Sequence, residues 1–183
     1  CFDGSVGLNV FFKKLLVTIW RGSRKSFRRF LFILDYCKFF KISNNRHINQ
    51  YVGNKNYQIS VNEISKNMIP KHVRNIFFKI DIESSEYDIL EELNLISDQI
   101  VGLVIEFHEV DRFMEKILNF IKIFPLLICH VHVNNFSTLT ETLVPKTIEV
   151  TFTSFRIETD SLVETLPNSL DRPNDPRHFH KVN

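Results

Sequence analysis

Acidic side chains follow an apolar run in the segment Phe77–Leu90, FFKIDIESSEYDIL. Asp81 and Glu83 stand two residues apart, and Glu86 follows a pair of serines. An unpaired carboxylate is costly to bury, but at the tip of a strand it can face a cleft, cap a helix, hold a hydroxyl group or bind a cation. We therefore take both acids as candidate ligand-binding residues. The alternative is that one of them only accepts hydrogen bonds from loop amides.

Two later segments also end in side chains that can exchange protons or bind metals. Glu106 and His108 close the apolar run IVGLVIEF and could act as an acid–base pair, share a metal, or simply form a polar strand exit. His130 and His132 alternate with valines, so both should point to one face of a strand. Such a pair can bind zinc or iron, and a metal site formed by these two histidines and Glu106 stays an alternative.

The strands that position these residues can be predicted from continuous apolar runs at 76–82, 100–107 and 127–133, with helical spacing between them. This alternation predicts an α/β domain with a mostly parallel sheet. Ligands of such sheets bind beyond the carboxyl ends of the strands. Polar residues at or just past the predicted strand ends should therefore converge on one rim: Asp3, Asp81, Glu83, Glu106, His108, His132 and Asn134.

Apolar spacing predicts four further elements: helices at 8–19 and 26–40, a short strand at 57–61 and a brief helix at 61–67. Ser85 is expected to cap the helix after the first apolar run, with Asp88 at capping-box distance. Asp111 is expected to cap the helix after the second run. Alternation at 148–153 predicts a strand with one solvated face, in a final antiparallel hairpin. The polar composition of 161–183 predicts an extended tail.

The composition narrows the class of protein. The chain has 183 residues, of which 44% are hydrophobic, enough for one core of ordinary size. A net charge of +2 is too small to indicate nucleic acid binding. The three cysteines are widely spaced and form no CxxC motif, so a reducing, cytoplasmic setting is expected. No apolar run approaches the roughly 18 residues of a membrane span, and no signal peptide is expected.

The basic residues are unevenly distributed. Trp20–Arg29, WRGSRKSFRR, is rich in arginine and contains no acid. It overlaps the start of the helix predicted at 26–40, in which apolar residues recur at helical spacing with arginines and lysines between them: Phe27, Phe30, Leu31, Ile33, Leu34 and Cys37. We interpret this segment as a solvated loop and helix start. The alternative is a surface that faces phosphate, an anionic lipid or an acidic glycan.

Several segments together resemble a known family. FFKIDIESSEYDIL is similar to the "KIDIEGxEyxvL" signature of FkbM-type methyltransferases, which use S-adenosylmethionine (SAM). The similarity continues in order through IVGLVIEFHEVD, HVHVNNF, VPKTIEVTFTS and LPNSLDRPNDP. It covers roughly Asp3 to Pro176 and is most specific from Ile76 onward.

The resemblance implies a class I methyltransferase-like (Rossmann-like) fold over about 1–160, with SAM as methyl donor. The acceptor would be an oxygen of a sugar, a glycan or a small metabolite, in a bacterial surface-glycan pathway. It also implies roles for named residues. Cofactor binding would fall to Asp3, Asp81 and Glu83, catalysis to Asp81, Glu106 and His108, and acceptor binding to Glu86, His132 and Asn134.

The chain departs from the family pattern in two ways. Ser84 stands where the family has a glycine, at a position where a positive φ angle can be required. The five glycines form no GxGxxG or P-loop motif, so we expect the family's first strand and glycine-rich loop to lie before Cys1. An N-terminally incomplete sheet would expose strand edges, and residues 1–183 should then bind SAM poorly or not at all. The alternative function is a non-catalytic α/β binding module derived from a methyltransferase.

Overall fold

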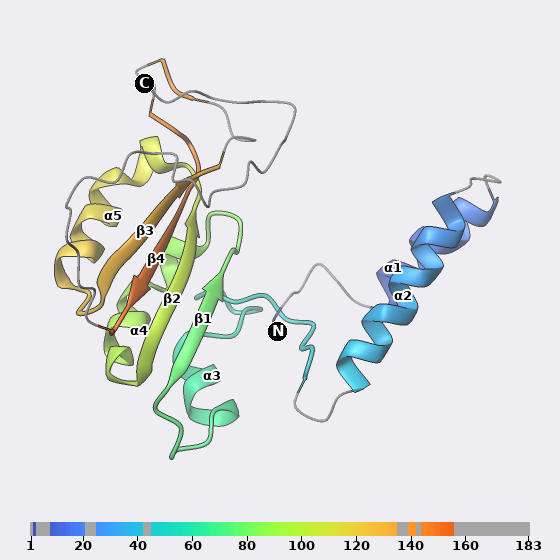
Figure 1. Cartoon of the computed structure of the whole chain (residues 1–183), viewed down its shortest axis with the longest axis horizontal. Helices are drawn as coiled ribbons and strands as arrows, with labels where there is room; N and C mark the ends of the chain where they lie inside the picture. Colours follow the sequence, from blue (N-terminus) through green and yellow to red (C-terminus); the bar gives the residue numbers. More distant parts are fainter. Residues whose placement is uncertain are drawn as a thin grey trace. The chain divides into compact units, whose positions relative to one another are not determined.

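The computed structural model describes residues 2, 8–20, 25–41, 45–134, 139–141 and 144–155. The chain divides into two compact units, Cys1–Ile59 and Ser60–Asn183. Figure 1 shows both units. Asp3 and the predicted tail at 161–183 lie outside the described residues.

Two helices, α1 (Leu8–Trp20) and α2 (Lys25–Lys41), pack against each other in the first unit. Both predicted helices are confirmed. The strand predicted at 57–61 is wrong, because Gly53 and its polar neighbours turn the chain back on itself. Only an isolated bridge joins Val52 to Ile59 there. Among the residues that the structure describes, no helix is long and apolar enough to cross a membrane.

The second unit contains a four-stranded mixed sheet, whose strands are β1 (Ile76–Ile80), β2 (Ile100–Phe107), β3 (Leu127–Val133) and β4 (Ile148–Thr153). Their order is β1-β2-β4-β3. β1 and β2 are parallel, whereas β4 is antiparallel to both of its neighbours. The α/β class and the C-terminal antiparallel hairpin are therefore confirmed. The sheet is mixed rather than built mainly from parallel pairs, because β4 inserts between β2 and β3.

One face of the sheet forms the core of this unit. Leu103, Ile105 and Phe107 of β2 are fully buried, and the β2–β4 register pairs Leu103 with Phe152 and Ile105 with Val150. These alternate residues point to the same face. Helices α4 (Leu90–Leu95) and α5 (Val110–Ile123) lie on one side of the sheet in Figure 1.

Aromatic contacts fix α5 to this face. The rings of Phe120 and Phe124 meet the ring of Phe152 edge-on, with centroids 5.8 and 5.3 Å apart. Phe120 and Phe124 also stack on each other at 4.6 Å. Edge-to-face pairs add to the free energy gained from burying the rings. Phe152 is thus the residue through which the central strand β4 contacts the helix.

The helix predicted at 61–67 is confirmed, whereas the two predicted helix caps are wrong. Helix α3 (Val61–Met68) begins with a capping box between Ser60 and Glu63. Ser85 makes no side-chain cap bond and instead precedes a 3-10 turn at Glu86–Asp88, so its predicted capping role is wrong.

Asp111 is not a cap either. Glu109 adopts a left-handed conformation, and its carbonyl accepts the backbone N–H groups of Arg112 and Phe113. The helix α5 therefore starts before Asp111, which lies within its first turn.

Phe152→Ala should lower the free energy of unfolding by about 3–5 kcal/mol, because it removes a buried ring and leaves a cavity between β4 and α5. Urea denaturation followed by circular dichroism measures this change. Phe155→Ala is the matched control, since Phe155 is 69% exposed just after β4 and should change stability by about 0.5 kcal/mol or less. Equal effects of the two substitutions would contradict this packing.

Candidate functional site

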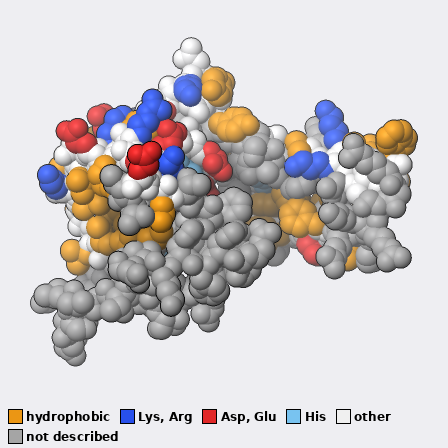
Figure 2. Space-filling model, turned by 90° about the horizontal axis from the view of Figure 1, so that it is seen from above, with side chains coloured by type: hydrophobic (Ala, Val, Ile, Leu, Met, Phe, Trp, Pro, Cys, Tyr) orange, Lys and Arg blue, Asp and Glu red, His pale blue; other side chains and the backbone are white. Residues whose placement is uncertain are grey.

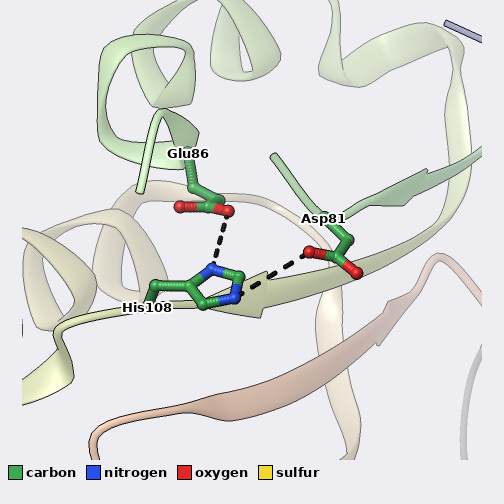
Figure 3. Close-up of side chains that lie close together, drawn as sticks. All are labelled: Asp81, Glu86 and His108. Atoms are coloured by element: carbon green, nitrogen blue, oxygen red, sulfur yellow. Dashed lines mark hydrogen bonds and ion pairs between the residues drawn. The ribbon is translucent and has the colours of Figure 1, made fainter. Parts of the chain in front are cut away.

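The candidate site lies where the parallel strands β1 and β2 end side by side. The register pairs Ile80 with Ile105, so the residues that follow both strands leave the sheet at the same edge. Asp81 follows β1 directly, and His108 follows β2 directly. Figure 3 shows the His108 ring between the carboxylates of Asp81 and Glu86. The sequence expectation that polar residues of these two strands meet at one rim is thus confirmed for Asp81 and His108.

Glu86 is the buried member of this group, with no exposed surface. Its Oε1 accepts the backbone N–H of Ile82 at 3.0 Å and lies 3.0 Å from His108 Nδ1. Its Oε2 is also buried and has no hydrogen-bond partner within the described residues. Burying a carboxylate costs free energy unless it is hydrogen-bonded, so these two contacts fix the position of the Glu86 carboxylate. Glu86 therefore joins the loop after β1 to the end of β2.

The contact with Glu86 also orients the imidazole. With Nδ1–H donated to Glu86, the other ring nitrogen, Nε2, points toward Asp81 and Glu83. The distances from Nε2 are 3.9 Å to Asp81 Oδ1 and 3.7 Å to Glu83 Oε2. Both exceed hydrogen-bond length, and a hydroxyl group or a water molecule can bridge such gaps. The ring thus presents one nitrogen to the rim with acidic groups beside it.

The environment raises the pKa of His108 above its ordinary value of 6.5. The hydrogen bond to Glu86 is the largest cause, partial burial opposes it, and the negative charges of Glu86, Glu83 and Glu106 add to the increase. Because the imidazolium is stabilised, the ring is well suited to receive a proton from a ligand.

Tyr87 fixes the backbone at this point. Its hydroxyl donates a 2.5 Å hydrogen bond to the carbonyl of His108, and its ring packs on Phe113 with centroids 4.2 Å apart. Burial, followed by the negative charges of Glu86, Glu109 and Asp111, raises the pKa of Tyr87. The hydroxyl therefore keeps its proton and remains a donor at all physiological pH values. Nothing in the sequence pattern distinguished Tyr87 from an ordinary core aromatic residue.

Three residues around the site have left-handed backbones although none is glycine. Glu83 has φ 53°, Ser84 has φ 74° and Glu109 has φ 50°. A hydrogen bond from Ser84 lowers the pKa of Glu109, and Arg112 adds to this effect. The turns after β1 and β2 are therefore linked by side chains. Backbone strain of this kind clusters at functional sites.

The remaining predicted residues make other side-chain contacts. Glu106 accepts a 2.8 Å hydrogen bond from Asn134 Nδ2, which joins the ends of β2 and β3. His132 stacks with His130, with ring centroids 6.5 Å apart, and pairs with Glu149 across the strands. The structure thus groups Asp81, Glu83, Glu86 and His108, and separately pairs Glu106 with Asn134.

Possible ligand atoms of Asp81, Glu86 and His108 lie within 4.8 Å of one another, a spacing that a metal ion could bridge. This trio differs from the alternative formed by His130, His132 and Glu106. Glu86 Oε1 already accepts the Ile82 amide, however, which suits an orienting role behind the histidine. Glu86, expected at the sequence level to contact an acceptor, is buried behind His108.

Replacing Ser84 tests the strain in the turn. Ser84→Gly and Ser84→Ala both remove the hydroxyl and differ only in the Cβ atom. We expect the glycine variant to be more stable by about 1 kcal/mol, because a side chain is unfavourable at positive φ. Chemical denaturation measures the difference. The same pair of substitutions at Ser65, inside helix α3, should give the opposite sign, with glycine less stable by about 1 kcal/mol. If the difference between glycine and alanine had the same sign at both positions, the left-handed conformation of Ser84 would be refuted.

His108 should make stability depend on pH. Its pKa is raised on folding, so the stabilisation is complete below about pH 6.5 and is lost as the pH rises through the higher folded-state pKa. Denaturation from pH 6 to 9 should therefore show falling stability, and His108→Gln should flatten that slope. His72→Gln is the control, because His72 is exposed and outside the site. An unchanged slope in His108→Gln would contradict the expected coupling.

No family model, curated protein or solved structure matches this chain. The methyltransferase resemblance therefore rests on its sequence motifs, and the chemical argument rests on the geometry of the rim.

Proposed function

We propose that the rim formed by β1 and β2 is the acceptor side of a SAM-dependent O-methyltransferase site, in which His108 is the general base. The observation that carries the proposal is the pairing of His108 Nδ1 with the buried carboxylate of Glu86. This pairing leaves Nε2 directed at the rim. The motif resemblance supplies the reaction class, and the mixed sheet with its C-terminal hairpin is compatible with a Rossmann-like fold.

The chain's contribution to the reaction is proton transfer and positioning. SAM, when bound, supplies a methyl group on a positively charged sulfur. His108 Nε2 would take the proton from an acceptor hydroxyl as that oxygen approaches the methyl group in line. Glu86 would hold the ring in the required tautomer and stabilise the imidazolium that forms. Tyr87 would keep the backbone of His108 in place through its hydrogen bond to the carbonyl.

The acidic residues of the rim suit a cationic, hydroxyl-bearing cofactor. The side chains of Asp81 and Glu83 are 46% and 87% exposed, so their carboxylates are accessible to a ligand. Carboxylates attract the sulfonium and ammonium groups of SAM and accept hydrogen bonds from ribose hydroxyls. Asp3, the residue that the family resemblance implies for the ribose, lies outside the described residues. Of the described residues, Asp81 and Glu83 would thus hold the cofactor.

The neighbouring pair of Glu106 and Asn134 suits an acceptor that carries several hydroxyl groups. The two side chains already hydrogen-bond to each other, and each retains capacity for a further polar contact. Glu106 belongs to β2, whose end forms part of the rim, and Asn134 follows β3, whose end lies at the same edge of the sheet. A sugar or a glycan end matches this combination of carboxylate, amide and imidazole better than an apolar acceptor would.

Methyl transfer provides the test. The chain is incubated with SAM carrying a labelled methyl group and a panel of sugars and hydroxylated metabolites, with product detected by mass spectrometry. Millimolar SAM is used because weak binding is expected. His108→Gln should lower the rate by about 100-fold or more. Asp98→Asn should leave it unchanged, because Asp98 is exposed, pairs with Arg74 and precedes β2 at its opposite end.

Binding is measured in parallel by nuclear magnetic resonance of the histidine rings. SAM should shift the His108 signals more than S-adenosylhomocysteine does, because the latter lacks the positive charge at sulfur. The combined substitutions Asp81→Asn and Glu83→Gln should weaken the effect. Absence of both methyl transfer and a His108 response would overturn the proposal. Sugar binding without any transfer would favour the non-catalytic binding module.

A further inference from the structure

The helical hairpin formed by α1 and α2 carries exposed apolar side chains at helical spacing. In α1 the most exposed of them occupy positions i, i+4, i+7 and i+8 and are between 50 and 87% exposed: Phe12, Leu16, Ile19 and Trp20. Val17 is 48% exposed and lies outside this stripe. The sequence pattern predicted an apolar face in α2, and three residues of that face are also exposed: Phe30, Leu31 and Leu34. Contiguous apolar surface of this kind marks an interaction site.

The contact between the two helices uses different residues. Leu15 and Thr18 of α1 and Ile33 of α2 are buried. Residues at i+3 lie on the same face of a helix, so Leu15 and Thr18 define the inward side of α1. The stripe from Phe12 to Trp20 lies on another side of the helix and is not needed to form the hairpin.

The same hairpin is strongly basic. Residues 8–41 contain nine lysines and arginines but a single acid, Asp35. The whole chain has a net charge of only +2, so the positive charge is concentrated here. In Figure 2, basic and hydrophobic side chains lie next to each other over this part of the molecule. A partner should therefore offer negative charge and an apolar environment together.

A nucleic acid, a second copy of the hairpin and a lipid bilayer differ in whether they offer both negative charge and an apolar environment. A nucleic acid would pair with the basic groups but offers little to aliphatic side chains such as Leu16 and Ile19. A second copy of the hairpin would cover the apolar stripe but bring two positive surfaces together. A lipid bilayer with anionic headgroups meets both requirements, because its interface accepts apolar side chains and attracts basic ones.

The helix lengths decide how such a membrane would be contacted. α1 has 13 residues and α2 has 17, fewer than the roughly 20 needed to span a bilayer. Tryptophan is favoured at the level of the headgroups, and Trp20 is 87% exposed at the end of α1. We propose that the α1–α2 hairpin lies in the surface of an anionic membrane, with its apolar stripe inserted among the headgroups and exposed lysines such as Lys38 and Lys41 near the phosphates.

Vesicle sedimentation of the full 183-residue chain tests this proposal. Vesicles of phosphatidylcholine alone are compared with vesicles in which about one lipid in three is phosphatidylglycerol. The chain should bind the anionic vesicles and bind the neutral ones far more weakly, and salt should reduce binding. The double substitution Leu16→Gln and Trp20→Gln should weaken binding about tenfold or more. Lys38→Gln and Lys41→Gln should each cost about fivefold.

Leu95→Gln is the matched control, because Leu95 is 78% exposed but belongs to the second unit. It should leave binding unchanged, and circular dichroism should show that all variants remain helical. Failure to bind anionic vesicles, or equal binding to both vesicle types, would overturn the proposal. So would binding to a DNA duplex that the Leu16 and Trp20 substitutions do not affect, or a dimer that those substitutions dissociate. These outcomes are independent of methyl transfer.

Discussion

The buried carboxylate of Glu86 is the interaction on which the arrangement of the rim depends. One oxygen receives both the Ile82 amide and the His108 ring, so a single atom ties the loop after β1 to the end of β2. A charged group without exposed surface is tolerable only where such partners compensate for its lost hydration. The same contact raises the pKa of His108 and directs its second nitrogen outward. The contact with Glu86 therefore determines the position, the tautomer and the basicity of His108.

The hydrophobic core holds the strands that make this contact possible. Phe107 ends β2 in the core, and His108 follows it directly at the rim. Tyr87 stacks near Phe107 while its hydroxyl binds the His108 carbonyl. Tyr87 thus contacts both the hydrophobic core and the backbone at the rim. Ser84 and Glu109, both with left-handed backbones, also link the turns after β1 and β2 through a hydrogen bond between their side chains.

The two units of the chain differ in physical character. The second unit has a buried core that contains Leu103, Phe107 and Phe152, as a globular α/β domain does, although apolar residues such as Phe77 and Leu95 are exposed on its surface. The α1–α2 hairpin instead leaves many of its aromatic and aliphatic side chains exposed and concentrates positive charge. The proposed membrane attachment of the hairpin and the proposed chemistry at the rim rest on different residues.

The sequence alone determined the strands and most helices of the second unit, because long apolar runs have few other ways to satisfy their backbone and bury their side chains. Strands 100–107 and 127–133 were predicted to the residue. It also located Asp81 and His108 at strand ends, since strand polarity decides where such residues emerge.

Only the tertiary structure decided which of the acidic residues are buried and which are exposed. Glu86 and Glu83 look equivalent in sequence, yet one is fully buried and the other is 87% exposed. The local sequence pattern does not distinguish Glu83 from Glu86, because the burial of Glu86 depends on the position of His108 at the end of the neighbouring strand β2. The predicted start of α5 was wrong for the same reason. Glu109 precedes α5 in a left-handed conformation, and its side chain is linked to Ser84 in the loop after β1. Contacts between distant segments, which no local periodicity encodes, set both outcomes.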